Sequence, residues 1–323
     1  MKRILLTGAS GFVGANLARR LLRDQHEVHL LLRDRHQTWR IEEITKDCSI
    51  SIADITNRES VTRCLRSAKP EWVFHLSAYG AYSNQTGFEQ MVATNLIGSA
   101  NMLDASIECG AESFVQTGSS SEYGYKSGAA REDDRVDPNS HYAISKAAAT
   151  HYCQFTARKL GLNAVTARLY SVYGPYEEPT RLIPTLIVHA LSNKLPPLVS
   201  PEIARDFVYV DDAVDALILL ASHQTASPGA IYNVCTGTQN SLAQIVELTR
   251  SLLDVRAAPE WGNMPRRAWD TDVWFGDPSA LRDDLGWIAE TSLCDGLARM
   301  IRWLRDNPRW LTFYSNRILQ TTD

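Results

Sequence analysis

A tyrosine lies four residues before a lysine in the stretch SHYAISKAA, residues 140–148. On a helix this spacing places Tyr142 and Lys146 on one face, one turn apart. A lysine held near a phenol stabilises the phenolate and lowers the pKa of the tyrosine, so that the tyrosine can transfer protons near neutral pH. Exposed helices often carry the same spacing, so the pair gains meaning only from the elements that position it.

A glycine-rich turn near the N-terminus is a second group that points to chemistry. The stretch TGASGFVG, residues 7–14, spaces its glycines as G-x-x-G-x-x-G. It follows a strand-like run, RILLTG (3–8), and opens a helical pattern over residues 12–25. Glycines let the backbone approach a pyrophosphate that rests on the N-terminus of the next helix. This strand–turn–helix context predicts dinucleotide binding.

Strand-like and helix-like segments alternate through the first half of the chain. The expected strands are 3–8, 27–33, 49–54, 71–78, 113–119 and 163–174, and the expected helices are 12–25, 58–68, 91–110 and 141–160. Such alternation predicts an α/β protein with a Rossmann-type, doubly wound parallel sheet.

The second half is less regular. Proline-bearing loops interrupt helical stretches at 182–193 and 241–253, which predicts a smaller mixed α/β lobe. The strand DFVYV (206–210) and the helix after it are expected to return to the main sheet. The expected division gives 1–172 plus 205–235 to the dinucleotide-binding domain, and 173–204 plus 236–323 to the lobe.

Composition excludes several classes of protein. The 323 residues carry 33 Lys and Arg against 37 Asp and Glu, without a long basic run, so no nucleic-acid partner is expected. No run of 18 apolar residues occurs, which predicts no membrane span. The six cysteines form no CxxC pair, and this favours reduced thiols in a cytoplasm over a metal site or disulfides.

Taken together, the motifs resemble the extended short-chain dehydrogenase/reductase family. More narrowly, they are similar to its nucleotide-sugar epimerases, dehydratases and ketoreductases, the NAD-dependent epimerase/dehydratase group. The resemblance rests on TGxxGxxG, on YxxxK and on GSSSEYG (118–124) between them, and it covers nearly the whole chain. Further matching segments are ADI (53–55), HLSA (75–78), NLIGSANML (95–103), RLYSVYGP (168–175), RLIP (181–184), ARDFVYVDDAVDA (204–216), RRAWDTDVWFGDPS (266–279) and LGW (285–287).

The resemblance implies roles for individual residues. Tyr142 would be the acid/base, Lys146 would tune it and contact the nicotinamide ribose, and Ser119 would hydrogen-bond the sugar oxygen. The implied cofactor-binding residues are Gly8, Ser10, Gly11, Phe12, Val13, Gly14, Arg33, Asp54, Ile55, Leu76, Ala78, Asn95, Tyr142, Lys146 and Leu169. The implied substrate-binding residues are Ser120, Ser121, Ser171, Arg181, Arg205, Arg267 and Asp270, whose arginines would clamp a diphosphate. Surface ion pairing with nearby acids is the alternative for these arginines.

The end of the second strand departs from the NAD-binding pattern. NAD-specific relatives usually carry an acidic residue near Leu32 for the ribose hydroxyls, whereas Leu32 is neutral and Arg33 follows it. An arginine suits a 2′-phosphate, so the sequence favours NADP(H) over NAD(H). Asp34 would argue for NAD(H) if the register differs by one or two residues.

The turn after the fifth expected strand departs from the dehydratases. Ser120 and Ser121 stand where those relatives carry Asp-Glu, so 4,6-dehydration is not expected. Glu122 is expected to point away, because neighbouring strand residues alternate faces. Ser171 replaces a frequent asparagine and LVSPE (198–202) replaces a glycine-bearing turn near the base, so the nucleotide base is left unassigned.

The expected function is therefore a nucleotide-sugar oxidoreductase acting at C4. Arg33 favours an NADPH-dependent reductase of an NDP-4-keto-6-deoxysugar, while the motif order favours an NDP-sugar 4-epimerase with tightly bound NAD; the balance leans to the reductase. A dehydratase and a non-catalytic dinucleotide sensor are the remaining alternatives. The resemblance also implies a homodimer through a four-helix bundle built from 91–109 and 141–160.

Overall fold

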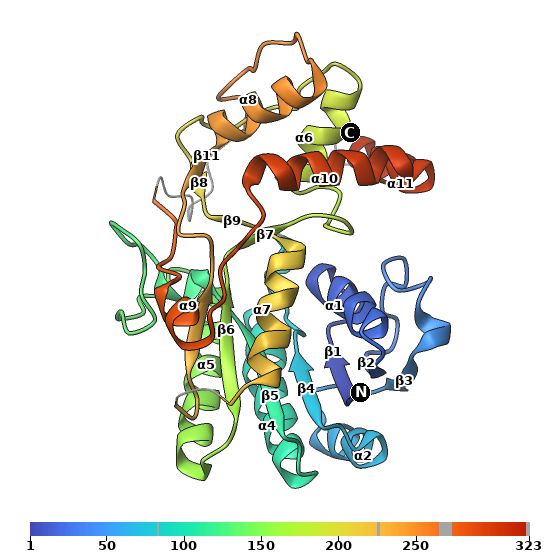
Figure 1. Cartoon of the computed structure of the whole chain (residues 1–323), viewed down its shortest axis with the longest axis vertical. Coiled ribbons are helices and arrows are strands. Elements are labelled where there is room, and N and C mark those ends of the chain that lie inside the picture. Colours follow the sequence, from blue (N-terminus) through green and yellow to red (C-terminus); the bar gives the residue numbers. More distant parts are fainter. Residues whose placement is uncertain (83, 225–226, 265–272, 321–323) are drawn as a thin grey trace.

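The computed structural model describes residues 1–82, 84–224, 227–264 and 273–320. Its main element is a sheet of seven parallel strands in the order β10-β6-β5-β4-β1-β2-β3 (Figure 1). The strands are β1 (Arg3–Thr7), β2 (Glu27–Leu32), β3 (Ser49–Ile52), β4 (Trp72–His75), β5 (Ser113–Ser119), β6 (Ala164–Leu169) and β10 (Ile231–Val234). The strand order reverses between β1 and β4, where open parallel sheets bind their ligands. The predicted doubly wound parallel sheet is confirmed.

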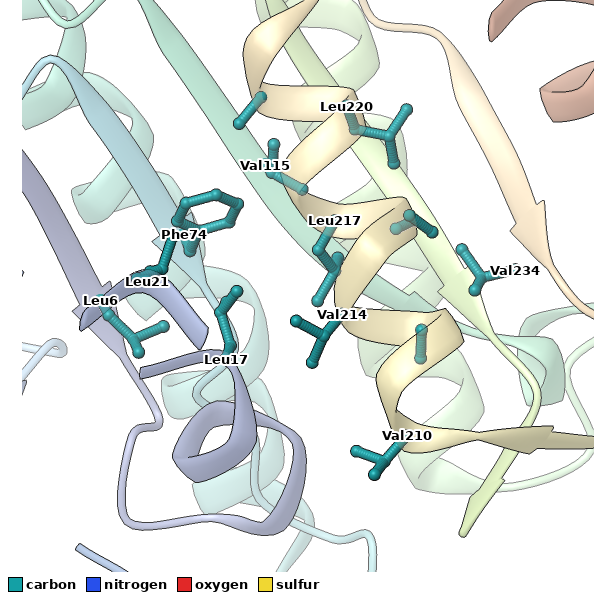
Figure 2. Close-up of a cluster of buried hydrophobic side chains, with 14 of the residues drawn as sticks. Leu6, Leu17, Leu21, Phe74, Val115, Val210, Val214, Leu217, Leu220 and Val234 are labelled. Carbon is teal, nitrogen blue, oxygen red and sulfur yellow. The ribbon is translucent and has the colours of Figure 1, made fainter. Parts of the chain in front are cut away.

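Helices cover both faces of this sheet. One face carries α1 (Phe12–Arg23) and α7 (Val210–Ser222), and the other carries α2 (Arg58–Ala68), α4 (Gly98–Glu108) and α5 (His141–Leu160). Figure 2 shows Leu17 of α1 and Val214 of α7 in one cluster with Leu6 and Phe74 of the strands. Leu5, the neighbour of Leu6, belongs to the cluster on the opposite face. Alternate strand residues thus supply two separate cores, because the sheet is buried on both sides.

The helix expected over residues 91–110 is built from three pieces. A single turn, α3 (Phe88–Met91), leads into a π-helical turn (Val92–Ile97) that continues as α4. Such π-helical turns interrupt α-helices mostly at functional sites. This one contains Asn95, which is fully buried.

A smaller lobe lies at one end of the main sheet (Figure 1). Its elements are β7 (Ser171–Tyr173), β8 (Ala204–Arg205), β9 (Phe207–Tyr209), β11 (Asn240–Ser241), α6 (Leu182–Leu191), α8 (Leu242–Leu253), α10 (Leu293–Asp306) and α11 (Pro308–Leu319). It has its own hydrophobic cluster, with Leu186, Val246, Leu297 and Tyr314 among the buried members. The mixed α/β character predicted for this part of the chain is confirmed.

Two expected strands have different positions in the structure. The run 163–174 divides into β6 of the main sheet and β7 of the lobe. The run 206–210 becomes β9, which pairs with β7 in a separate two-stranded sheet, so the prediction that this strand returns to the main sheet is wrong. Only α7, which begins at Val210, packs back on the main sheet. The apolar pattern of a buried strand does not specify which sheet it joins.

Aromatic side chains connect the two parts of the chain. Trp39, in the connection between β2 and β3, has its ring centroid 4.9 Å from that of Phe313 and 5.6 Å from that of Trp310, both on α11. Aromatic pairs at these distances add to the burial of their surfaces. A segment next to the Gly-rich turn therefore packs against the C-terminal helices.

The last segment before α10 belongs partly to the main sheet. Leu281 of α9 (Ser279–Leu285) and Trp287 are buried in the cluster that covers β10. The division of the chain into two domains stays a prediction. Helix α9 falls within the range assigned to the lobe, yet it packs on the main sheet. Among the described residues, no helix is both long and apolar enough to cross a membrane.

Candidate active site

The tyrosine of the YxxxK pair lies in the first turn of α5. Ser140 precedes this helix, and its hydroxyl accepts a hydrogen bond from the amide of Ala143 at 3.2 Å, a regular N-terminal cap. The carboxyl end of β5 packs against α5, and the Ser119 side chain lies near enough to the Tyr142 phenol to lower its pKa. The structure therefore brings together Ser119 and Tyr142, which are 23 residues apart in the sequence.

Burial dominates the acidity of the Tyr142 phenol. The side chain is half-buried, and desolvation raises its pKa to about 12, against smaller lowering effects of Ser119 and Arg181. The carboxylate of Glu122 raises the pKa further. The pKa of Tyr142 is thus raised, and not lowered as the YxxxK spacing predicts, so the phenol is protonated near neutral pH.

Lys146 is buried one helical turn further on. Its ammonium donates a hydrogen bond to the Thr117 carbonyl of β5 at 2.5 Å. Burial lowers the pKa of Lys146 to about 8, while Glu122 acts in the opposite direction. The lysine is therefore mainly protonated at pH 7 and loses its charge in the mildly alkaline range.

A hydrogen-bond network fixes the back of α5. The Asn95 amide donates to the Ser145 hydroxyl at 2.8 Å, and this hydroxyl donates to the Tyr142 carbonyl at 2.8 Å. Asn95 also accepts from the Tyr79 amide at 2.8 Å, in the segment after β4. Asn95 was predicted from the resemblance, whereas Ser145 was missed, although it directly precedes the lysine.

His75 extends this network toward the Gly-rich turn. It lies within 2.8 Å of the Thr7 hydroxyl and within 3.0 Å of the Ser99 hydroxyl. Burial lowers the pKa of His75 to about 3, so the imidazole is neutral. The HLSA segment was part of the sequence resemblance, but nothing in the pattern assigned its histidine a partner.

The Gly-rich turn is shaped by close backbone contacts. A Cβ added at Gly14 would lie 2.2 Å from the Gly8 carbonyl oxygen, and Gly8 itself has φ +74°, which L-residues rarely adopt. Helix α1 begins after Gly11 without a side-chain cap and without an acidic residue in its first turn. Free amides at Phe12 and Val13 and a positive helix end suit a dinucleotide diphosphate, so the turn fits the predicted cofactor.

The other predicted cofactor residues surround this turn to different degrees. Arg33 is exposed just after β2, and Asp54 is exposed with its carboxylate accepting from the Thr56 amide at 2.9 Å. Ile55 is buried, and its carbonyl accepts from the Asn101 amide. Ser10, Leu76 and Leu169 are half-buried, and Ala78 is exposed.

Arg40 is a residue near the turn that the sequence did not single out. It is 3 % exposed and donates to the Tyr176 carbonyl at 2.8 Å, to Glu178 at 2.9 Å and to the Ser10 carbonyl at 3.4 Å. One buried guanidinium thus joins the Gly-rich turn to the segment that precedes α6. No local motif marks it, because its partners are 30 and more than 130 residues away.

The predicted substrate residues occupy two sites. Ser120 is buried, and its hydroxyl accepts from the Trp274 indole at 2.9 Å, while Ser121 lies with its hydroxyl 2.7 Å from that of Ser119. The Arg205 guanidinium lies 5.2 Å from the Trp274 ring centroid, which places this arginine near the turn Ser120–Tyr123 that Trp274 contacts. Trp274 was missed, since its position emerges only when the chain folds back.

The other predicted substrate residues lie on the lobe side of the site or outside the described residues. Arg181 is exposed, donates to the Ala81 carbonyl at 3.4 Å and lies over the Tyr82 ring. Ser171 is half-buried in β7. Arg267 and Asp270 lie outside the described residues.

Comparison with protein families identifies the family of this chain. The model for the NAD dependent epimerase/dehydratase family matches residues 4–235, which include the Gly-rich turn, Ser119, Tyr142 and Lys146. The chain belongs to the NAD dependent epimerase/dehydratase family. Membership explains why one edge of the sheet holds both a dinucleotide-type turn and the Ser/Tyr/Lys group.

Individual relatives of the epimerase/dehydratase family align along nearly the whole chain. A probable dTDP-glucose 4,6-dehydratase of Sinorhizobium fredii is 30% identical over 95% of this chain and 94% of its own. The crystal structure of a UDP-glucose 4-epimerase from Thermotoga maritima, with UDP-glucose, is similar with a TM-score of 0.84 and 25% identity, covering 94% of this chain and 99% of that one. A Thermus thermophilus UDP-glucose 4-epimerase in complex with NAD gives a TM-score of 0.81 and 27% identity with the same coverage.

Within the epimerase/dehydratase frame, the arrangement supports proton transfer at one oxygen. The Ser119 hydroxyl lies near the Tyr142 phenol, and Lys146, one helical turn further on, holds its ammonium against the Thr117 carbonyl of β5. Positions 120 and 121, in the turn after β5, are both serines, so neither supplies a carboxylate. Glu122 lies in the 3-10 turn (Ser120–Tyr123) rather than on the strand, and its carboxylate contacts the Ser119 amide and Arg168.

Proposed function

We propose that the protein is a nucleotide-sugar oxidoreductase that exchanges a hydride and a proton at C4 of the sugar. The observation that carries the proposal is the packing of the first turns of α5, with Tyr142 and Lys146, against the end of β5 that bears Ser119, at the same edge of the sheet as the Gly-rich turn. The names of the relatives, which act on dTDP-glucose or UDP-glucose, support the substrate class.

The side chains suggest how the step proceeds. A nicotinamide dinucleotide on the N-terminus of α1 supplies hydride chemistry when bound. Ser119 hydrogen-bonds the oxygen on C4, and Tyr142 gives that oxygen a proton as the phenol or takes one from it as the phenolate. Lys146 holds a positive charge near the phenol and so opposes the cost of phenolate formation. Asn95 and Ser145 keep the first turn of α5 in place.

Two versions of this chemistry differ in their net reaction. The NADPH-dependent reductase of an NDP-4-keto-6-deoxysugar is supported by Arg33 after a neutral Leu32 and by a Tyr142 that is protonated near neutral pH, the form that donates. The 4-epimerase is supported by the epimerases among the structural neighbours, one of them in complex with NAD. The 4,6-dehydratase is less well supported, because Ser120 and Ser121 have no carboxyl group.

Binding residues follow from the same proposal. We assign NADP(H), in preference to NAD(H), to the Gly-rich turn, Arg33 and the β4 end, and the NDP diphosphate to Arg205 with Arg181 and Arg267. Ser121 and Ser171 are proposed to contact the sugar. The Ser120 hydroxyl already accepts a hydrogen bond from the Trp274 indole. Ser121 is therefore the first candidate for a sugar contact in this turn.

A homodimer through a four-helix bundle also stays a proposal. Large apolar side chains are exposed on the two candidate segments: Ile97 at 46% on the π-helical turn, and Ile144 at 46% and Phe155 at 64% on α5. Exposed apolar side chains gathered on neighbouring helices suit a subunit interface. Light scattering of the wild-type protein, compared with a variant carrying F155E, tests this proposal.

The function is tested with the wild-type protein and Tyr142→Phe as a matched control. Each is mixed with NADPH or NADH and a panel of NDP-4-keto-6-deoxysugars, and reduced-nicotinamide absorbance is followed. Absorbance loss in the wild type alone supports the reductase. Conversion of an NDP-hexose to its C4 epimer without net absorbance loss supports the epimerase. Neither activity, with dinucleotide binding intact, would overturn the proposed function.

A further inference from the structure

A buried ion pair holds the segment Ser119–Tyr123, which we call the catalytic turn because it carries Ser119. The Glu122 carboxylate accepts from Arg168 Nε at 2.8 Å, and the two side chains are 0% and 1% exposed. Arg168 comes from β6, the strand next to β5. Removing two charges from water is costly, and a buried ion pair is weak evidence for stability. Its position beside the reacting groups therefore points to a role other than stabilising the fold.

The same carboxylate determines the conformation of the turn. Its second oxygen accepts from the Ser119 amide at 2.8 Å, and the Ser119 hydroxyl accepts from the Ser121 amide at 3.2 Å, which together form a capping box. Gly118 makes this close approach possible, because a Cβ there would lie 2.7 Å from the carboxylate oxygen. Glu122 thus fixes the backbone from which Ser119 projects.

The opposite partner is fixed from several sides. The Arg168 guanidinium lies 4.4 Å from the Tyr123 ring centroid and reaches the Glu132 carbonyl at 3.4 Å. The Tyr123 hydroxyl donates to Asn233 of β10 at 2.7 Å. The carboxylate therefore cannot turn away from Ser119 without leaving a buried arginine unpaired.

Glu122 also acts on both reacting groups of α5. Its negative charge raises the pKa of Lys146, against burial, and raises the pKa of Tyr142. The other ionisable groups that face these two residues are the neutral His75 near Lys146, and Arg181 and Tyr82 near Tyr142. Glu122 is the acid that both share.

We propose that Glu122, held by Arg168, is a positioning residue that orients Ser119 toward the C4 oxygen. This inference rests on the proposed C4 chemistry. It gives the pair a kinetic role, acting through Ser119, rather than a role in folding alone. The sequence pattern indicated only that Glu122 would point away from the substrate.

The test uses three variants of the full-length protein. Glu122→Gln removes the charge but can still accept from the Ser119 amide. The double variant E122Q/R168M also removes the arginine, so that no unpaired charge stays buried. The control is Asp212→Asn, another buried acid, on α7, which accepts from Thr291 on the opposite face of the sheet from α5.

The expected result separates rate from folding. E122Q lowers kcat on the order of 10- to 100-fold, as a small misplacement of a reacting group does, with the KM for the nucleotide sugar and the dinucleotide affinity nearly unchanged. The alkaline limb of the kcat–pH profile moves to lower pH, because Lys146 loses the charge that favours its protonated form. The double variant recovers thermal stability relative to E122Q but neither kcat nor the alkaline limb, and D212N keeps both.

Two outcomes would overturn the inference. One is unchanged kcat and pH profile in E122Q; the other is recovery of kcat together with thermal stability in the double variant, which would make the pair purely structural. If the wild type turns over no nucleotide sugar, the readout is the ionisation of Tyr142, measured as the ultraviolet titration difference between each protein and its Y142F counterpart. A lower ionisation pH in E122Q still supports the placement of Glu122, and an unchanged one contradicts it.

Discussion

The Gly-rich turn and the catalytic turn lie at the same edge of the sheet, yet they are built in opposite ways. The first is shaped by the absence of side chains, since Gly14 lies so close to Gly8 that no Cβ fits between them. The second is shaped by side chains from distant parts of the chain, with Arg168 and Asn95 holding Glu122 and Ser145. The cofactor end therefore should fail when an atom is added, and the catalytic end when an atom is removed.

The largest effect is expected at the catalytic end, from the loss of one oxygen atom. Tyr142→Phe removes the proton donor and should lower kcat by about 10²- to 10⁴-fold, the usual contribution of general acid–base catalysis. Dinucleotide affinity should stay within a few-fold of the wild type, because the Gly-rich turn is untouched. Steady-state kinetics and fluorescence titration with NADPH measure the two quantities. A variant with weakened dinucleotide binding and normal kcat would reverse the roles assigned to the two turns.

The counterpart at the cofactor end is the gain of one carbon atom. In Gly14→Ala the new Cβ would lie 2.2 Å from the Gly8 carbonyl oxygen, so the turn must shift. Overpacking of this kind typically costs about 1–3 kcal/mol, and dinucleotide binding should fall with it. Thermal unfolding and NADPH titration are the measurements, with Gly128→Ala as a control, because an added Cβ there has open space around it and Gly128 does not have a positive φ. Normal dinucleotide affinity in G14A would show that the turn is not a close-packed cradle.

A smaller effect should appear in the pH dependence. Burial lowers the pKa of Lys146 to about 8, so the ammonium is present below this pH and is lost as the pH rises through it. Activity that depends on the charged lysine should therefore decline above about pH 8, while dinucleotide binding through the Gly-rich turn should not follow the same curve. The kcat–pH profile of the wild type, compared with that of Lys146→Arg, locates the decline. Coincident curves for binding and rate would mean that the two turns titrate as one unit.

The smallest effect is expected where the catalytic end depends on local capping. Ser140→Ala removes the hydroxyl that accepts from the Ala143 amide and should cost about 1 kcal/mol of stability. The rate should change only a little, since Asn95 and Ser145 still hold the turn that carries Tyr142. Urea unfolding and kcat measure both. A rate loss as large as that of Y142F would mean that the cap, and not the long-range network, positions the phenol.

The same contrast explains how much the sequence could predict. Glycine spacing and the alternation of strands and helices are local, and they were enough for the parallel sheet, the Gly-rich turn and the YxxxK helix. The pairing of Glu122 with Arg168 and the hydrogen bonds of Arg40 and Trp274 join residues 30 or more positions apart, and no short pattern contains them. The fate of residues 206–210 had the same cause, because an apolar run fits either sheet equally well. Burial, which raises the pKa of Tyr142 above what the spacing predicts, is likewise a property of the whole fold.

The contact between Trp39 and α11 makes the two ends of the chain interdependent. The connection between β2 and β3 is supported by the rings of Trp310 and Phe313, which come from a helix more than 270 residues later in the sequence. Because Arg40, the next residue, reaches the Gly-rich turn, this support extends to the cofactor site. Proteolytic removal of the chain from Trp310 onward should thus weaken dinucleotide binding, although the binding turn lies at the opposite end of the sequence from the cut.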